Sequence, residues 1–182
     1  MKVIVAVTGA SGAIYARQVL ETLLKDKSVE RIALIHSRHA PDVITAEGVI
    51  LPTDPRIEVF DNDDMWSSVA SGSAKWNAMI IVPASMGCVG RIASGVSQTL
   101  IERAADVMLK ERRRVVVVVR EAPYSLIHLR NMTTLTEAGT IIIPASPAFY
   151  FRPESIEELC RNLSERIVEA VGIEVEHKAW GE

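Results

Sequence analysis

The feature that most constrains the fold of this chain is the join between an apolar run and a glycine-containing turn near the N-terminus. Residues 3–7 are valine, isoleucine and alanine, and such a run is too short for a helix, so it indicates a buried parallel strand. Gly9 and Gly12 follow, and apolar residues then recur at helical spacing as far as Leu24. Small residues and free N–H groups at the start of a helix attract anions. We therefore expect residues 9–12 to hold a phosphate.

The same alternation of strand and helix patterns continues to the end of the chain. Repeated βα units predict a parallel sheet with helices on both faces, which is an α/β fold. Ser37 is expected to be the N-cap of a helix that carries Glu47, and Gly139 should end a later helix. Further strands are expected at 31–36, 57–60, 78–83, 114–120 and 140–144, and helices after residue 86 with a break near Gly95, at 125–138 and at 154–171.

Length, charge and cysteine usage exclude several classes of protein. The 182 residues, 48% of them apolar, fit one domain that spans 1–182. A net charge of -3 gives no basic surface for nucleic acid. The two cysteines show no disulfide spacing and the opening run lacks the features of a secretory leader, so we expect a cytoplasmic protein. No apolar run approaches the roughly 20 residues that span a bilayer.

Small and polar residues follow the expected strands, where parallel sheets bind ligands. A nicotinamide dinucleotide is one candidate, because the turn is similar to the Thr-Gly-x-x-Gly opening of short-chain dehydrogenases. However, the second strand ends in His36-Ser37-Arg38 instead of an acid for the ribose, and the chain contains no Tyr-x-x-x-Lys pair. A mononucleotide with one phosphate fits the pattern better.

Six ordered motifs resemble those of the flavin prenyltransferases of the UbiX type. The resemblance covers nearly the whole chain, to Trp180-Gly181-Glu182. Six motifs in order are far more specific than a single glycine-rich turn. The motifs are Pro83–Met86, Arg103–Val107, Leu109–Arg113, Arg120–Pro123, Ile127–Met132 and Pro147–Pro153.

This resemblance implies a fold, an activity and partners. The fold would be a Rossmann-like three-layer αβα sandwich with a mostly parallel sheet. The activity would be transfer of a dimethylallyl group from dimethylallyl phosphate to N5 and C6 of reduced FMN, without a metal. The prenylated FMN would serve a UbiD-type decarboxylase. Members of the family are typically homododecamers with sites between subunits.

The resemblance also implies roles for particular residues. Ser11 would lie near N5 of the flavin, and Glu47 matches a glutamate proposed to move protons. Tyr150 and Arg166 correspond to residues that bind the donor phosphate. Lys110 and Glu121 would line the same pocket and take part in catalysis, and Arg103 would join them. The residues implied to contact FMN are Gly9, Ala10, Ser11, Ser37, Ser85, Met86, Gly87, Cys88 and Arg120.

The chemistry of these side chains is consistent with the implied reaction. Breaking an allylic C–O bond leaves charge on the departing phosphate, so fixed cations and donors are needed around it. Lys110, Arg103, Arg120, Arg166 and Tyr150 are candidates. The spacing of Arg103 and Asp106 also matches an ordinary ion pair on a helix surface.

Some positions depart from the family pattern. Many members have Pro-Cys-Ser-x-Lys-Thr where this chain has Gly87 and Cys88 at the last two positions, and the missing lysine bears on FMN affinity. The aromatic residue that contacts the prenyl chain is displaced, with Trp66 near the expected place and able to stabilise an allylic cation. Trp66 and Trp76 are equally compatible with filling an interface between subunits.

Other functions remain as alternatives. The runner-up is an FMN-dependent cysteine decarboxylase of the same superfamily, but its Pro-x-Met-Asn motif is replaced by Arg130-Asn131-Met132. A flavin-storage module would not need the cationic residues. The run Asp61–Asp64 is faintly similar to the magnesium-binding aspartates of larger prenyltransferases, but acidic turns are usually only solvated, so we expect no metal site.

Overall fold

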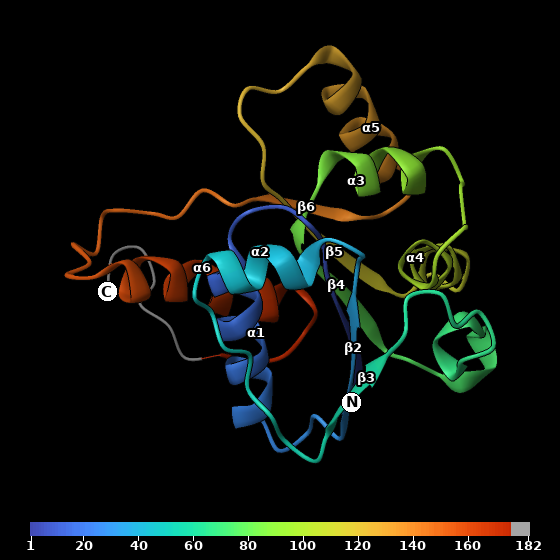
Figure 1. The fold of residues 1–182 in the computed structure, drawn as a ribbon, viewed down its shortest axis with the longest axis horizontal. Helices are drawn as coiled ribbons and strands as arrows, with labels where there is room; N and C mark the ends of the chain where they lie inside the picture. The colour runs from blue at the N-terminus through green and yellow to red at the C-terminus, as the bar shows by residue number, and fades with distance from the viewer. Residues whose placement is uncertain (176–182) are drawn as a thin grey trace.

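The computed structural model describes residues 1–175, so Trp180–Glu182 lie outside the described residues. Six parallel strands form a single sheet in the order β3-β2-β1-β4-β5-β6 (Figure 1). This arrangement confirms the expected α/β fold with a parallel sheet. The strands are β1 (Lys2–Val7), β2 (Arg31–His36), β3 (Ile57–Phe60), β4 (Ala78–Ala84), β5 (Arg114–Val119) and β6 (Ile141–Pro144).

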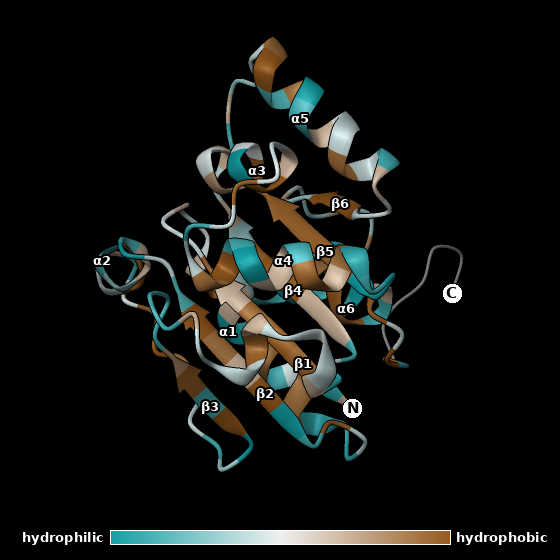
Figure 2. Ribbon diagram, turned by 90° about the vertical axis from the view of Figure 1, so that its right-hand side faces the viewer, coloured by the Kyte–Doolittle hydropathy of each residue, from teal (hydrophilic) through white to brown (hydrophobic). Residues whose placement is uncertain are grey.

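Helices cover both faces of the sheet and complete three layers. One face packs on α1 and α6, and the other packs on α3, α4 and the segment that precedes β4 (Figure 1). The four inner strands between them are apolar on both sides, as the colours of Figure 2 show, because each of their faces is buried, whereas β3 and β6 at the edges are partly exposed. The helices are α1 (Ala13–Lys25), α2 (Ala40–Ala46), α3 (Met86–Ala93), α4 (Leu100–Lys110), α5 (Leu126–Glu137) and α6 (Ile156–Ala170), with short 3₁₀ turns η1 (Ser68–Ala70) and η2 (Gly72–Ala74).

The order of the strands creates a switch point between β1 and β4. The chain first builds outward from β1 through β2 to β3, and then returns to add β4 on the other side of β1. Connections from the two central strands therefore leave in opposite directions, which opens a crevice at their carboxyl ends. Thr8 joins the two sides of this crevice, since its hydroxyl donates to the Pro83 carbonyl (2.7 Å) and accepts from the Ser85 N–H (2.8 Å).

The expected strands and most helices are confirmed within a few residues, but the start of α2 is not. Ser37 is not its N-cap. The helix begins at Ala40, with Pro41 in its first turn, where a fixed φ and a missing N–H favour a start. Ser37 instead donates its backbone N–H to the Val7 carbonyl (2.9 Å), which extends the pairing of β1 and β2. Among the described residues, no helix is long and apolar enough to cross a membrane.

Candidate active site

A cavity of about 360 Å³ lies at the switch point. We call it the switch-point cavity. It combines hydroxyl groups from four different loops with two arginine side chains, so it can hold an anion by hydrogen bonds and by charge. Its lining residues are Thr8, Gly9, Ser37, Arg38, His39, Asn62, Ser85, Cys88, Arg91, Thr99, Ile101 and Glu102.

An ion pair between two helices shapes one wall of this cavity. Nε of Arg91, on α3, donates to the carboxylate of Glu102, on α4, whose side chain is 1% exposed. The same carboxylate accepts the N–H groups of Gln98 (2.9 Å) and Thr99 (3.1 Å), which caps the start of α4. Burial raises the pKa of Glu102, but these hydrogen bonds and the arginine outweigh burial and lower it overall. Glu102 is therefore a fixed anion in the wall.

Cys88 lies beside this ion pair and is not a reactive thiol. Its side chain is buried on α3, and burial raises its pKa to about 12, although the nearby Arg91 acts in the opposite direction. A thiolate is the reactive form of cysteine, and little of it exists at neutral pH with such a pKa. Cys88 therefore serves as an apolar wall residue.

The turn after β1 holds an anion, but that anion comes from the chain itself. The carboxylate of Glu47 accepts the N–H groups of Gly12 (2.8 Å) and Ala13 (2.7 Å), at the start of α1. The Ser11 hydroxyl donates to the same carboxylate. Glu47 thus neutralises the N-terminus of α1 and takes up the Gly12 N–H, so phosphate binding by residues 9–12 stays a prediction that concerns Gly9, Ala10 and Ser11.

Glu47 is ionised and lies close to a cation. Burial acts to raise the pKa of Glu47, but the hydrogen bonds from Ser11, Gly12 and Ala13 and the charge of Arg120 lower it overall. Arg120 follows β5, so its side chain belongs to the same edge of the sheet as the turn after β1. The structure thus joins three of the sequence-predicted residues, Ser11, Glu47 and Arg120, into one polar cluster.

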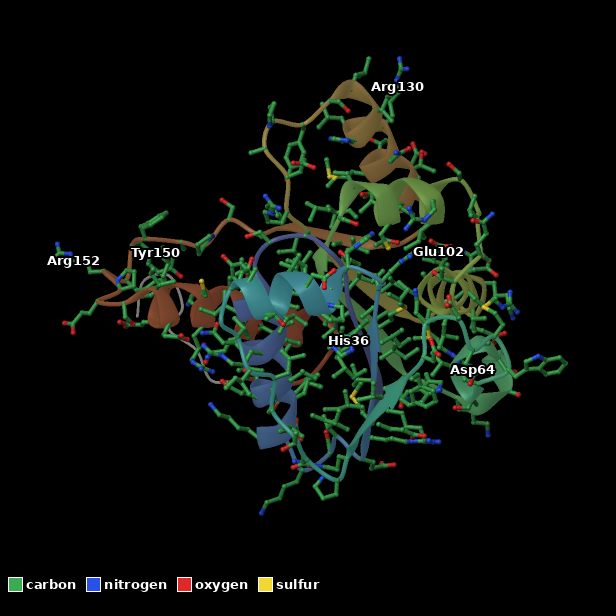
Figure 3. The ribbon with its side chains drawn as sticks, in the orientation of Figure 1. His36, Asp64, Glu102, Arg130, Tyr150 and Arg152 are labelled. Carbon is green, nitrogen blue, oxygen red and sulfur yellow. The ribbon has the colours of Figure 1, made fainter. Side chains whose placement is uncertain are left out.

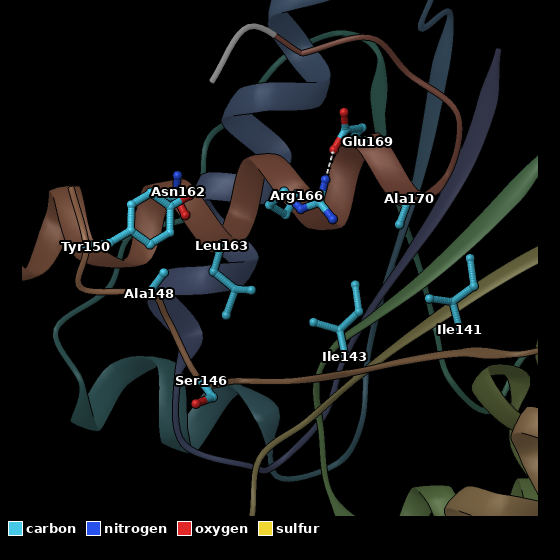
Figure 4. A pocket seen from close by; sticks show the side chains of 10 residues that line it. All are labelled: Ile141, Ile143, Ser146, Ala148, Tyr150, Asn162, Leu163, Arg166, Glu169 and Ala170. Carbon is cyan, nitrogen blue, oxygen red and sulfur yellow. Dashed lines mark hydrogen bonds and ion pairs between the residues drawn. The ribbon is translucent and has the colours of Figure 1, made fainter. Parts of the chain in front are cut away.

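A second cavity, of about 500 Å³, lies between the edge strand β6 and helix α6 (Figure 4). We call it the β6–α6 groove. It contains both Tyr150 and Arg166, as the sequence predicted for a shared donor site, together with Ser146 and Asn162. Nη1 of Arg166 donates to Glu169 (2.6 Å), one turn further along the exposed side of α6. The groove shares no lining residue with the switch-point cavity.

The chain does not bring Lys110 and Arg103 into the groove. Lys110 ends α4 at the edge where the strands begin and pairs with Glu111 (2.6 Å). With 1.5 Å of rise per residue, Lys110 lies about 12 Å along α4 from Glu102, which lines the switch-point cavity. Arg103 is held by the Ala70 carbonyl (3.2 Å) and by Asp106 (2.6 Å), which is the ordinary helix-surface pair. The expected pocket with Lys110 is therefore not formed within one chain.

Glu121 also lacks the cationic neighbours that we expected. Its carboxylate accepts the backbone N–H of Ala122 (3.0 Å), and within residues 1–175 it makes no ion pair. Glu121 follows β5 directly and so lies at the correct edge of the sheet. The cations that we expected to orient the Glu121 carboxylate, however, lie elsewhere in the chain.

The two tryptophans that the sequence left undecided have different environments. Trp76 is 2% exposed and packs edge-on against Phe60 at a centroid distance of 6.4 Å, so it belongs to the core of its own chain. Trp66 is 98% exposed.

Asp61 and Asp64 accept backbone N–H groups within their turn, and the described part of the chain contains no cluster of acidic, histidine or cysteine side chains able to hold a metal.

The residues implied to contact FMN have different positions in the chain. Four of them, Gly9, Ser37, Ser85 and Cys88, line the switch-point cavity, whereas Ala10 and Met86 are buried and Ser11, Gly87 and Arg120 are not among its lining residues, so their contact with FMN stays a prediction. Sequence reasoning missed several cavity residues, because nothing in their local pattern distinguishes them from ordinary helix and loop positions. The missed residues are Thr8, Arg38, His39, Asn62, Arg91, Thr99, Ile101 and Glu102.

Comparison with known proteins identifies close relatives over the full length. The model of the family described as Flavoprotein matches residues 1–171. The flavin prenyltransferase UbiX of Methanocaldococcus jannaschii is 41% identical, over 100% of this chain and 99% of that protein. The flavin prenyltransferase UbiX of Pseudomonas aeruginosa is 40% identical, over 100% of this chain and 94% of that protein.

Solved structures agree with these relatives. A crystal structure of AnUbiX with FMN and dimethylallyl pyrophosphate is 39% identical, has a TM-score of 0.88 and covers 98% of each chain. A dodecameric FMN-dependent UbiX-like decarboxylase from Escherichia coli is 34% identical, with a TM-score of 0.92 over 100% of each chain. The FMN-dependent cysteine decarboxylase TvaF is only 14% identical, with a TM-score of 0.61 over 84% of this chain, which shows a shared fold alone.

Proposed function

Because this chain belongs to the flavoprotein family, and within it to the flavin prenyltransferases of the UbiX type, we propose that it transfers a dimethylallyl group from dimethylallyl phosphate to reduced FMN. The observation that carries this proposal is the presence of two separate cavities in one chain, the switch-point cavity and the β6–α6 groove, each lined by arginine and hydroxyl-bearing side chains. A transfer between two phosphorylated molecules requires two such places. The cysteine decarboxylase alternative is not favoured, because proteins of that kind match the chain in fold alone.

FMN fits the switch-point cavity by the chemistry of its donors. A phosphate monoester is a dianion near neutral pH and accepts several hydrogen bonds, and the hydroxyls of Ser37 and Ser85 and the guanidinium of Arg38 line the same space. The opening at the carboxyl ends of β1 and β4 is where doubly wound sheets bind nucleotides. When bound, reduced FMN supplies the nucleophilic positions N5 and C6.

We assign the proton chemistry to Ser11 and Glu47. The hydroxyl of Ser11 donates to the ionised Glu47 carboxylate, so this pair can accept a proton and pass it along one hydrogen bond. The N–H groups of Gly12 and Ala13 fix the carboxylate on the rigid start of α1. Arg120 supports the ionised form of Glu47 through its charge. Glu121, the residue that follows Arg120, is the next carboxylate along the chain.

Tyr150 and Arg166 are the residues that we assign to the donor phosphate. The phenol and the guanidinium both line the β6–α6 groove, as Figure 4 shows, and both can donate to phosphate oxygens. As the allylic C–O bond breaks, negative charge accumulates on the leaving phosphate, and fixed donors lower the energy of that state. The exposed pair with Glu169 is weak, so Arg166 can exchange it for a phosphate at low cost.

We propose that a second copy of the chain supplies Lys110 and Arg103 to this donor site. One chain holds these cations on α4, away from the groove, and the dodecameric relative from Escherichia coli supports a homo-oligomer of the same size here. If Lys110→Ala and Arg166→Ala variants are each inactive, mixed oligomers made by refolding the two together should regain about a quarter of the activity through wild-type pairs. Absence of recovery would show that both residues act within one chain.

The product, prenylated FMN, would then be delivered to a UbiD-type decarboxylase, and we place the reaction in the cytoplasm. The free thiols of Cys88 and Cys160 are compatible with that reducing compartment. The decisive experiment is anaerobic incubation with reduced FMN and dimethylallyl phosphate, followed by mass spectrometry of the released flavin. The expected product is FMN that carries one added dimethylallyl unit. Unmodified FMN after full binding of both substrates would overturn the proposed function.

A further inference from the structure

The wall of the switch-point cavity contains a cation that the sequence did not single out. Arg91 lies on α3, one turn after Gly87, and its Nη1 atom is 3.4 Å from the place that a Cβ at Gly87 would occupy. The guanidinium therefore lies over a position that has no side chain. This is also the position at which the family resemblance anticipates a lysine.

Arg91 is held in place through one of its three nitrogen atoms. Its Nε donates to Glu102, which leaves the four N–H groups of Nη1 and Nη2 for other acceptors. Glu102 is 1% exposed and is itself fixed by the N–H groups of Gln98 and Thr99. A rigid, buried carboxylate at Nε orients the planar fork of the guanidinium, and such a fork matches phosphate oxygens in a bidentate geometry.

We propose that Arg91 binds the phosphate of FMN and that Glu102 is a positioning residue that holds the Arg91 guanidinium in the switch-point cavity. The inference rests on the proposed function and adds a residue to its flavin site. Its consequence is selectivity: riboflavin, which has the same ring system without the phosphate, gains nothing from Arg91. The chain should therefore prefer FMN to riboflavin largely because of this ion pair.

The test measures dissociation constants for FMN and for riboflavin by quenching of flavin fluorescence. Arg91→Met alone would leave a buried carboxylate without its partner, so the main variant is Arg91→Met combined with Glu102→Gln, which removes both charges. We expect FMN binding to weaken about 10- to 100-fold and riboflavin binding to change less than about threefold, as for the loss of a hydrogen bond to a charged group. Arg130→Met, on the exposed surface of α5, is the matched control and should change neither constant.

Two single variants separate binding from positioning. Arg91→Lys keeps the charge without the fork and should lose less FMN affinity than the double variant. Glu102→Gln keeps the arginine but loosens it, and should weaken FMN by a smaller factor than the double variant while riboflavin binding stays constant. Thermal unfolding of each variant in the absence of flavin checks that the fold is intact.

The outcomes distinguish this inference from the proposed function. If the double variant loses FMN and riboflavin affinity equally, or loses neither, Arg91 is only the partner of Glu102 and the inference is overturned. The same holds if the unmodified protein shows no preference for FMN over riboflavin. A protein that binds FMN through Arg91 but never prenylates it would instead overturn the proposed function and leave the inference standing.

Discussion

The switch-point cavity and the β6–α6 groove differ in how their charged residues are held. In the cavity, Arg91 on α3 is fixed by Glu102 on a different helix, and that carboxylate is almost fully buried. In the groove, Arg166 pairs with Glu169 one turn away on the same exposed helix face. Figure 3 shows Glu102 and Tyr150, which mark the two regions, on opposite sides of the molecule.

This difference indicates which part of the site one chain completes by itself. An ion pair between two packed helices is set by the fold, whereas an exposed pair within one helix contributes only about 0–1 kcal/mol and rearranges easily. The cations expected beside Arg166, namely Lys110 and Arg103, are held elsewhere in the chain. We therefore regard the cavity as preformed and the groove as a half-site that association completes.

The largest effect that would test this division is expected from Arg166→Ala. If the groove serves only the donor, FMN affinity should change less than about twofold. The value of kcat/KM for prenylation should fall by at least about 100-fold, because the leaving phosphate no longer has the positive charge of the Arg166 guanidinium beside it. Titration with FMN and a discontinuous assay of prenylated flavin give the two values. Arg161→Ala is the control, since Arg161 lies on the same helix and pairs with Glu21 outside the groove.

Tyr150→Phe should have a smaller effect in the same direction. Loss of one hydrogen bond to a charged oxygen costs roughly 1.5–3 kcal/mol, which corresponds to about a 10- to 100-fold loss in kcat/KM. FMN binding should be unchanged, and Tyr124→Phe, in the loop before α5, should be neutral in both assays. If Tyr150→Phe released flavin as readily as it lost product, the cavity and the groove would not be separate sites.

The fold was predictable from sequence because its signals are local. Apolar runs such as 115–119 can only be buried strands, and their alternation with helical patterns requires a parallel sheet. The exception, the start of α2, was decided by Pro41 instead of Ser37, which is a competition between two local signals. The resemblance to a family then supplied the activity, the two groove residues Tyr150 and Arg166, and four of the residues that line the switch-point cavity.

The cavity walls were not predictable, because they depend on which helices meet. Glu102 reads as an ordinary charge in the first turn of a helix, and only the packing of α3 on α4 makes it a buried partner of Arg91. Likewise, Glu47 lies far from Gly12 in the sequence, and the turn of α2 over the start of α1 brings its carboxylate to those N–H groups. The position of Lys110 was not predictable either, since its motif carries no information about the edge of the sheet on which it lies.

A moderate effect on stability should follow from Glu47→Gln, because the Glu47 carboxylate, like that of Glu102, is held in place by groups of its own chain. The pKa of Glu47 is lowered in the folded chain, so its contribution is present above the pKa of an unfolded glutamate, about 4.3, and is lost as the pH falls through the lower folded value. Loss of a helix cap costs about 1 kcal/mol. The variant should therefore unfold about 2–4 °C lower than the unmodified chain at pH 7.

The same difference in unfolding temperature should shrink when it is measured by calorimetry near pH 3, where both states of the unmodified chain approach protonation. Glu137→Gln, at the exposed end of α5, is the control and should show no such dependence on pH. A difference between Glu47→Gln and the unmodified chain that grew toward low pH would mean that the carboxylate does not act as an anionic cap on α1.

The smallest effect is expected from EDTA, which should leave the rate of prenylation unchanged. This experiment decides which positive charges complete the donor site in the β6–α6 groove. Two sources of positive charge are possible for the leaving phosphate: cations from a second copy of the chain, or a divalent metal ion. Within residues 1–175, no three histidine, cysteine, aspartate or glutamate side chains are grouped so that they could hold a metal ion. If a second copy of the chain supplies the charge, prenylation by the assembled protein should proceed at an unchanged rate in EDTA, whereas dilution that dissociates the oligomer should abolish it. Loss of activity in EDTA and its recovery with magnesium would assign the missing charge to a metal, with Asp61–Asp64 as the first residues to substitute.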